Sequence, residues 1–197
     1  MNNLVAGGNQ EKKFLEETRL IDTVSELANV ELGLDQLSLM QTTSNLIKHF
    51  ILDETPPKLI LLFSYQIKLS FLGTPESDEI GIIEQMHALE VLAKKKIEHA
   101  LKFASKQVIA KLCGLLKSKN SDIFMKAAKI LSMFFSFEEY PDVINNAIFE
   151  GVFPGMLQLL YSALDSESLG IILFGLSNIT GGHESHVTAF LNEEELV

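Results

Sequence analysis

Tryptophan is absent from this chain of 197 residues, and cysteine occurs once, at Cys113. A single cysteine excludes an internal disulfide framework. Its position in the apolar run VIAKLCGLL predicts a buried structural thiol rather than a nucleophile. The most apolar run, PKLILLFSYQIKLSFLG, is interrupted by Ser64, Gln66 and Lys68, so it falls short of the ~20 apolar residues of a membrane span. The start, MNNLVAGGNQEKK, has no continuous apolar core and so predicts no signal peptide. We therefore expect an intracellular protein, in the cytoplasm, the nucleus or both.

Basic residues are also scarce. Lysine and arginine total 16 against 26 aspartates and glutamates, which gives a formal net charge of −10. This balance argues against nucleic acid as the main partner and permits basic partners. An acidic balance is also a common way for a protein to stay soluble. With 47% apolar and 21% charged residues, the composition is that of a folded chain rather than a disordered one.

Strand signals are nearly absent, because the chain has no long alternating Val/Ile/Thr runs and no Asn-Gly hairpins. Helical signals occur throughout. Three long segments begin with polar capping residues and continue with apolar residues at steps of three and four, at 78–95, 121–137 and 166–180. A shorter apolar helix precedes each of them, and a weaker long segment covers 35–51. The pattern predicts an all-α fold.

The long helices repeat. The runs HALEVLA, ILSMFFS and FGLSNIT begin at His87, Ile130 and Phe174, at steps of 43 and 44 residues, and QTTSNLI begins 46 residues before His87. Helical repeats of roughly 40–47 residues are typical of armadillo and HEAT solenoids. Chance similarity among leucine-rich helices is the alternative, but it does not account for the shared capping residues and spacing. We predict a right-handed armadillo-type helical solenoid of about four repeats over 35–197, with 1–34 as an N-terminal helical cap or arm.

The last repeat carries a family resemblance. The stretch Glu139–Gly182 resembles a complete armadillo repeat, with a short first helix, a break at Gly151, a second helix opened by Pro154, and a third helix that ends in Ser-Asn-Ile-Thr. The run LSNITGGHESHVTAFLNEEELV is particularly similar to the corresponding segment of importin-alpha, the adaptor that carries nuclear localisation signals. The resemblance implies that the third helices line a concave groove for an extended, lysine-rich peptide.

In importin-alpha the groove uses repeated Trp-x-x-x-Asn pairs, and the equivalent pairs here are Gln41/Asn45, His87/Val91, Ile130/Phe134 and Phe174/Asn178. Two pairs keep the asparagine and none keeps the tryptophan. An asparagine amide offers both a donor and an acceptor to a peptide main chain. An aromatic ring one turn earlier offers a surface to the alkyl stem of a lysine. The candidate peptide-binding residues are therefore Asn178, Phe174, Asn45, Gln41 and His87.

Asn178 has an alternative role, as a residue that caps its own helix end beside Gly181. The C-terminal run HESHVTAFLNEEELV is typical of the first helix of a further repeat and stops where a second helix would begin. A solenoid end without a polar cap exposes apolar residues. We therefore expect an incomplete C-terminal repeat whose residues Phe190, Leu191 and Val197 mediate self-association or contact a partner.

His183 and His186, with Glu184 between them, have no third ligand nearby, so we interpret them as solvated polar residues rather than a metal site. No phosphate-binding glycine loop and no catalytic motif is present, so the sequence predicts neither an enzyme nor a cofactor. Two functions remain. The first is a peptide-binding module, and the alternative is an armadillo scaffold held permanently in a protein assembly. A surface at Ile130 and Phe134 that the chain itself fills would favour the scaffold.

Overall fold

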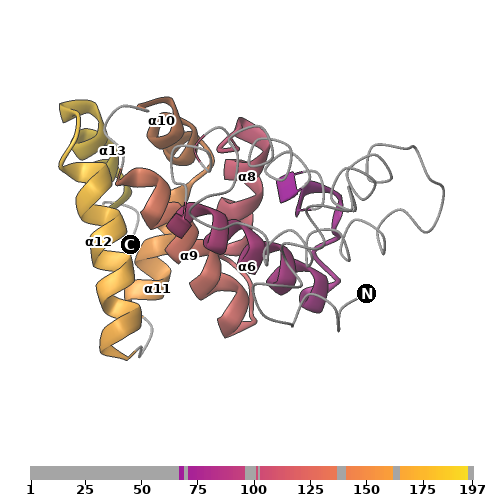
Figure 1. The fold of residues 1–197 in the computed structure, drawn as a ribbon. Coiled ribbons are helices and arrows are strands. Elements are labelled where there is room, and N and C mark those ends of the chain that lie inside the picture. Colours follow the sequence, from indigo (N-terminus) through magenta and orange to yellow (C-terminus); the bar gives the residue numbers. More distant parts are fainter. Residues whose placement is uncertain are drawn as a thin grey trace, which may run out of the picture. The chain divides into compact units, whose positions relative to one another are not determined.

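The computed structural model describes residues 67–68, 71–95, 101, 103–136, 141–161 and 165–194. Within these ranges every regular element is a helix and none is a strand, which confirms the predicted all-α class (Figure 1). The chain divides into two compact units, Met1–His99 and Ala100–Val197. The helix predicted at 35–51 and the boundary predicted after residue 34 lie outside the described residues.

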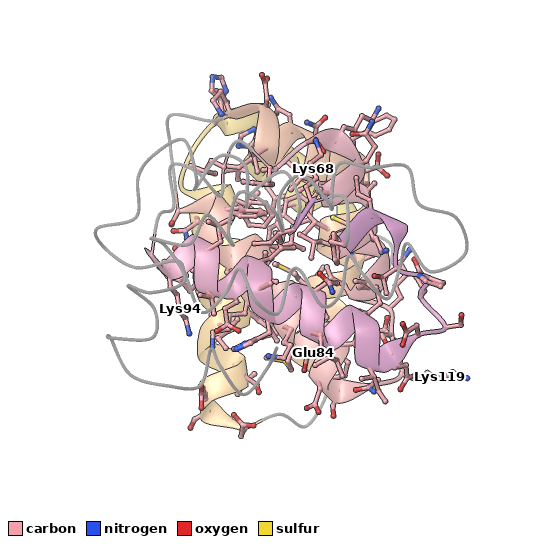
Figure 2. All side chains as sticks on the ribbon, turned by 45° about the vertical axis from the view of Figure 1, so that its right-hand side comes forward. Lys68, Glu84, Lys94 and Lys119 are labelled. Atoms are coloured by element: carbon pink, nitrogen blue, oxygen red, sulfur yellow. The ribbon has the colours of Figure 1, made fainter. Side chains whose placement is uncertain are left out.

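In the first unit, helix α6 spans Glu79–Lys95. Asp78 starts it, because its Oδ1 accepts a hydrogen bond from the Gly81 N–H at 3.0 Å. The apolar residues Ile82, Met86, Leu89 and Leu92 recur at steps of three and four and are fully buried. Lys94 projects outward near the end of α6 (Figure 2), with its Nζ 2.7 Å from Glu90 Oε1.

The second unit contains six described helices. They are α8 (Lys106–Leu115), α9 (Ser121–Phe135), α10 (Pro141–Phe149), α11 (Val152–Tyr161), α12 (Ser166–Thr180) and α13 (Glu184–Glu194). The long helices α6, α9 and α12 differ from the predicted segments by at most two residues at either end. Polar side chains start both α9 and α12, as predicted. Asn120 Oδ1 accepts from the Asp122 N–H at 3.0 Å, and Asp165 Oδ1 accepts from the Ser168 N–H at 2.9 Å. The latter bond lowers the pKa of the Asp165 carboxyl.

The break between α10 and α11 lies at Gly151, whose φ of 78° is in the left-handed region that side chains avoid. Its N–H donates to the Ile148 carbonyl at 3.0 Å, which ends α10, and the two helix axes then differ by 75°. The sequence predicted that the second helix starts at Pro154. In the structure α11 starts two residues earlier, at Val152. Pro154 is tolerated there because the N–H groups of a first helical turn have no acceptor within the helix.

Helix α12 packs along α9, and α11 and α13 also contact α12 (Figure 1). Gly175 of α12 lies directly against Ser132 of α9, and a Cβ at Gly175 would overlap the Ser132 Oγ and lie 3.2 Å from Met156 Cε. The Ser132 hydroxyl donates to the Ile171 carbonyl at 3.1 Å. Two small residues thus let the long helices of adjacent repeats approach closely.

No single described helix is long and apolar enough to cross a membrane, and only the bent pair α10 and α11 reaches that length and composition together.

We expect Leu176→Ala to lower the free energy of unfolding by ~2–5 kcal/mol, because the side chain is 7% exposed and its removal leaves a cavity. Leu89, fully buried in α6, should behave alike. Urea denaturation measures both changes. Ser177→Ala, at an exposed position next to Leu176, should change stability by less than about 0.5 kcal/mol. A loss at Leu176 as small as this control would contradict its place in the core.

We expect Gly175→Ala to destabilise the chain by ~1–3 kcal/mol, because the new methyl group overlaps the Ser132 hydroxyl. Ser132→Ala removes that oxygen, so the double variant should lose less stability than the sum of the two single variants. A thermal-denaturation double-mutant cycle measures this coupling. Additive effects would show that the two helices do not meet at this pair.

Candidate functional site

Helix α12 has two opposite faces. Its buried residues recur every three or four positions and face the rest of the unit, namely Ser168, Ile172, Gly175, Leu176 and Ile179. Its exposed residues follow the same spacing on the other side, namely Ser166, Glu167, Gly170, Leu173, Phe174 and Ser177. Leu173 and Phe174 are each 53% exposed. Together they form a small apolar surface that a ligand or partner could cover.

Phe174 and Asn178 are four residues apart, so they project from neighbouring turns on one side of α12. Phe174 is half-exposed, whereas Asn178 is partly buried. Glu167, seven residues before Phe174, is exposed on the same side. This side of α12 therefore carries an aromatic ring, an amide and a carboxylate within about three turns.

The Asn178 amide is not paired within the chain. Its Nδ2 is buried and has no hydrogen-bond partner. A buried unpartnered donor costs ~1–3 kcal/mol, so it is retained only where something else compensates. Other groups satisfy the end of α12. The Gly181 N–H donates to the Ser177 carbonyl at 2.7 Å, and the Thr180 hydroxyl donates to the Leu176 carbonyl at 2.9 Å. Capping by the Asn178 side chain, the alternative raised from the sequence, is therefore not observed.

The other candidate peptide-binding residues, and the residues aligned with them, differ in how exposed they are. His87 is exposed on α6, and Val91 is partly buried one turn later. Gln41 and Asn45 lie outside the described residues. Ile130 and Phe134, aligned with Phe174 and Asn178, are both 0% exposed. Their large apolar side chains are part of the core, so α9 presents no open binding surface at these two positions.

The predicted C-terminal interface is partly covered. Phe190 packs on Phe153 of α11, with the ring centroids 5.3 Å apart and an edge-to-face angle of 65°. Leu191 is 54% exposed, and Val197 lies outside the described residues. Phe190 thus fixes α13 to the preceding repeat, and Leu191 remains available on the surface.

The interpretation of His186 as a solvated residue is wrong. Its side chain is 5% exposed, and its Nε2 lies 3.0 Å from the Asn145 Oδ1 of α10. Since an amide oxygen only accepts, the His186 Nε2 carries the proton and donates. His183 stays exposed, with its ring centroid 6.0 Å from that of His186. Within the described ranges no three His, Cys, Asp or Glu side chains are grouped as a metal site requires.

Cys113 is buried in α8, and burial raises the pKa of its thiol to about 12. The thiol therefore stays protonated at neutral pH and is a poor nucleophile. Its Sγ lies 3.9 Å from the Ala147 carbonyl of α10, a weak contact between the two helices. This matches the structural role expected from the sequence.

Sequence reasoning missed Leu173, whose exposure equals that of Phe174. It also missed Gln85, which is fully buried in α6 with neither amide atom hydrogen-bonded. For Leu173 the available signal was its position next to Phe174, a candidate peptide-binding residue. For Gln85 the signal was its spacing, because it lies three residues after Ile82 and four before Leu89, on the buried side of α6.

No family model and no curated protein matches the chain. Solved structures do match its fold. A designed armadillo repeat protein in complex with the peptide (KR)4 superimposes with a TM-score of 0.67 at 15% identity, over 98% of this chain and 78% of that one. Computationally designed armadillo repeat proteins for modular peptide recognition give 0.67 at 14% identity, over 98% and 79%. An engineered protein gives 0.66 at 18% identity, over 98% and 77%. The chain has the armadillo-repeat fold, as the helical repeat predicted.

We expect Asn178→Leu to leave the stability unchanged or to raise it by up to ~1 kcal/mol, because leucine removes an unpartnered buried donor at similar volume. Asn145→Leu is the matched control. It deprives the buried His186 of its acceptor and should cost ~1–3 kcal/mol. Thermal denaturation compares the two variants. A loss at Asn178 as large as that at Asn145 would show that the Asn178 amide is a structural group.

Proposed function

We propose that this chain is a non-enzymatic protein-binding module that holds an extended, basic peptide against α12, at Phe174 and Asn178. The observation that carries the proposal is the unpartnered Nδ2 of Asn178, one turn from a half-exposed phenylalanine. A bound peptide backbone would supply the carbonyl that this donor lacks. The resemblance to importin-alpha favours a nuclear localisation signal as the peptide, and action in the cytoplasm or the nucleus.

Binding would require a small rearrangement of Asn178. The Nδ2 is buried in the free chain, so the amide must rotate to present it to a ligand. The Nδ2 forms no hydrogen bond that this rotation would break. The new bond to a peptide carbonyl would recover the ~1–3 kcal/mol lost by the unpartnered donor. The free chain is therefore at a local disadvantage that a ligand relieves.

Charge favours a basic ligand. The formal net charge of −10 attracts cationic peptides, and Glu167 is an exposed carboxylate on the same side of α12 as Phe174. The Phe174 ring would contact the alkyl stem of a lysine or arginine, with a cation–π contribution of ~0.5–1 kcal/mol at an exposed site. The designed armadillo protein solved with (KR)4 holds a ligand of this class. Asn45, and with it a second contact to the peptide, belongs to the proposal but lies outside the described residues.

A specific observation also favours the alternative function, a scaffold. The residues aligned with Phe174 and Asn178 one repeat earlier, Ile130 and Phe134, are fully buried. A peptide could therefore use this pair of positions on α12 but not on α9. If the basic peptide does not bind, the exposed Leu173, Phe174 and Leu191 would instead contact a permanent partner in an assembly.

We expect the intact chain to bind fluorescein-labelled (KR)4, and Phe174→Ala and Asn178→Leu each to weaken binding by roughly 5- to 150-fold, the equivalent of ~1–3 kcal/mol. Fluorescence anisotropy measures the affinity at low and physiological salt. Ser177→Ala, exposed on α12 between the two residues, is the matched control and should bind like the wild type. An acidic peptide of equal length controls for non-specific attraction.

Equal binding by the wild type and both variants would show that the net charge alone attracts the peptide. Absence of binding by the wild type would support the scaffold.

A further inference from the structure

Charge is unevenly distributed along the second unit. All seven of its basic residues are lysines between Ala100 and Lys129, a stretch with a single acidic residue, Asp122. From Ile130 to Val197 the chain has no lysine or arginine and has ten aspartates and glutamates. A chain of formal net charge −10 therefore contains one distinctly basic part.

Helix α8 carries this basic charge on its exposed side. Lys106 is exposed at its first residue, and Lys117 and Lys119 are exposed just after its end. Figure 2 shows Lys119 projecting away from the ribbon. Lys106 and Lys117 are eleven residues apart, about three helical turns, so they project from the same side about 16 Å apart along the axis. The residues between them on that side, Ala110 and Gly114, are small and leave room for the main chain of a partner.

These three exposed lysines keep their charge available. Among the described residues, no carboxylate forms an ion pair with Lys106, Lys117 or Lys119. The Lys106 Nζ instead lies 4.7 Å from the centroid of the Phe149 ring, and Phe149 is 77% exposed. An aromatic ring orients an ammonium group without neutralising it. One end of this surface thus offers a cation beside an apolar ring, and the other end offers two cations.

This surface is a particular feature of α8. Helix α11 holds the equivalent place one repeat later, and Glu150 and Tyr161 stand 44 residues after Lys106 and Lys117. The positive charge is therefore not a general property of this helix in the repeat. Figure 1 shows α8 at the opposite end of the second unit from α12 and α13. The surface is separate from the candidate peptide site on α12.

We propose that the lysine face of α8, formed by Lys106, Lys117 and Lys119 with Phe149 beside them, binds an acidic segment of a partner protein. Carboxylates of the segment would pair with the lysines, and an apolar side chain would cover the Phe149 ring. An extended segment of about five residues spans the ~16 Å between the two ends. This second surface goes beyond the proposed function and does not depend on it.

The size of the lysine face favours an acidic protein segment over nucleic acid. Proteins that bind nucleic acid tightly neutralise about 6–10 phosphates, more than three exposed lysines can contact. A long polyanion would also extend toward the ten carboxylates of 130–197 and be repelled by them. A short segment confined to α8 avoids that repulsion, because exposed charges farther apart than about 8 Å are largely screened at physiological salt.

Fluorescence anisotropy of the intact chain with a fluorescein-labelled peptide of eight glutamates, at low ionic strength, tests the proposal. The chain as a whole repels this peptide, so binding requires a local basic site. We expect the wild type to bind it, and Lys106→Gln and Lys117→Gln each to weaken binding by about 2- to 5-fold, the usual range of an exposed ion pair. The double variant should weaken it by about 4- to 25-fold.

Ser177→Glu is the matched control. It lowers the net charge by the same single unit as each lysine variant, at an exposed position of α12, and should bind the glutamate peptide like the wild type. All variants should keep the circular dichroism spectrum of the wild type, because the substituted residues are exposed.

Two results would overturn the proposal at once. These are no binding by the wild type, or equal affinity of the double lysine variant and Ser177→Glu. An oligothymidylate of eight nucleotides that binds more tightly than the peptide, and that loses affinity in the lysine variants, would assign the face to nucleic acid instead.

The glutamate peptide also separates this proposal from the proposed function. Because it binds at α8, its affinity should be unchanged in Phe174→Ala and Asn178→Leu, and the acidic control peptide of the (KR)4 experiment should behave alike. A weaker affinity in those two variants would place the acidic peptide on α12 and contradict the proposal. Failure of (KR)4 to bind, with the glutamate peptide still bound through Lys106 and Lys117, would contradict the proposed function alone.

Discussion

The close contact between Gly175 and Ser132 determines how the described part of the second unit is arranged. It brings α12 so close to α9 that a Cβ at position 175 would overlap the Ser132 hydroxyl, and this hydroxyl binds the backbone of α12 at Ile171. This contact fixes the rotation of α12 about its own axis. The rotation decides which residues of α12 enter the core and which face the solvent, and the candidate peptide site follows from it.

That rotation explains why two neighbouring exposed residues of α12 point in different directions. Successive residues of a helix point about 100° apart, so Phe174 lies closer to the side that carries Asn178, whereas Leu173 points away from it. With Gly175 directed at α9, Leu173 must face the solvent on the far side. The partly buried position of Asn178 follows from the same geometry, because it stands at the border between the packed and the exposed faces.

The sequence predicted the helices well because its strongest signals are local. Asn120 and Asp165 accept hydrogen bonds from the first turns of their helices, and Gly151 adopts the left-handed conformation that ends α10. Burial depends on residues distant in sequence and was harder to predict. Ile130 and Phe174 hold equivalent positions in the alignment of the repeats, yet Ile130 is fully buried and Phe174 is half-exposed. His186 was misjudged for the same reason, since its partner Asn145 lies 41 residues earlier.

The unpartnered Asn178 amide and the exposed Leu173–Phe174 pair are two unfavourable features of the same helix. They differ in the kind of contact that would stabilise them. A buried donor is relieved only by an acceptor at a defined position, so it favours a ligand with a regular array of carbonyl groups, such as an extended peptide. Exposed apolar area is relieved by any apolar contact and carries little directional information. Specificity for a peptide would therefore reside in Asn178, whereas Leu173 and Phe174 would contribute affinity to whichever partner covers them.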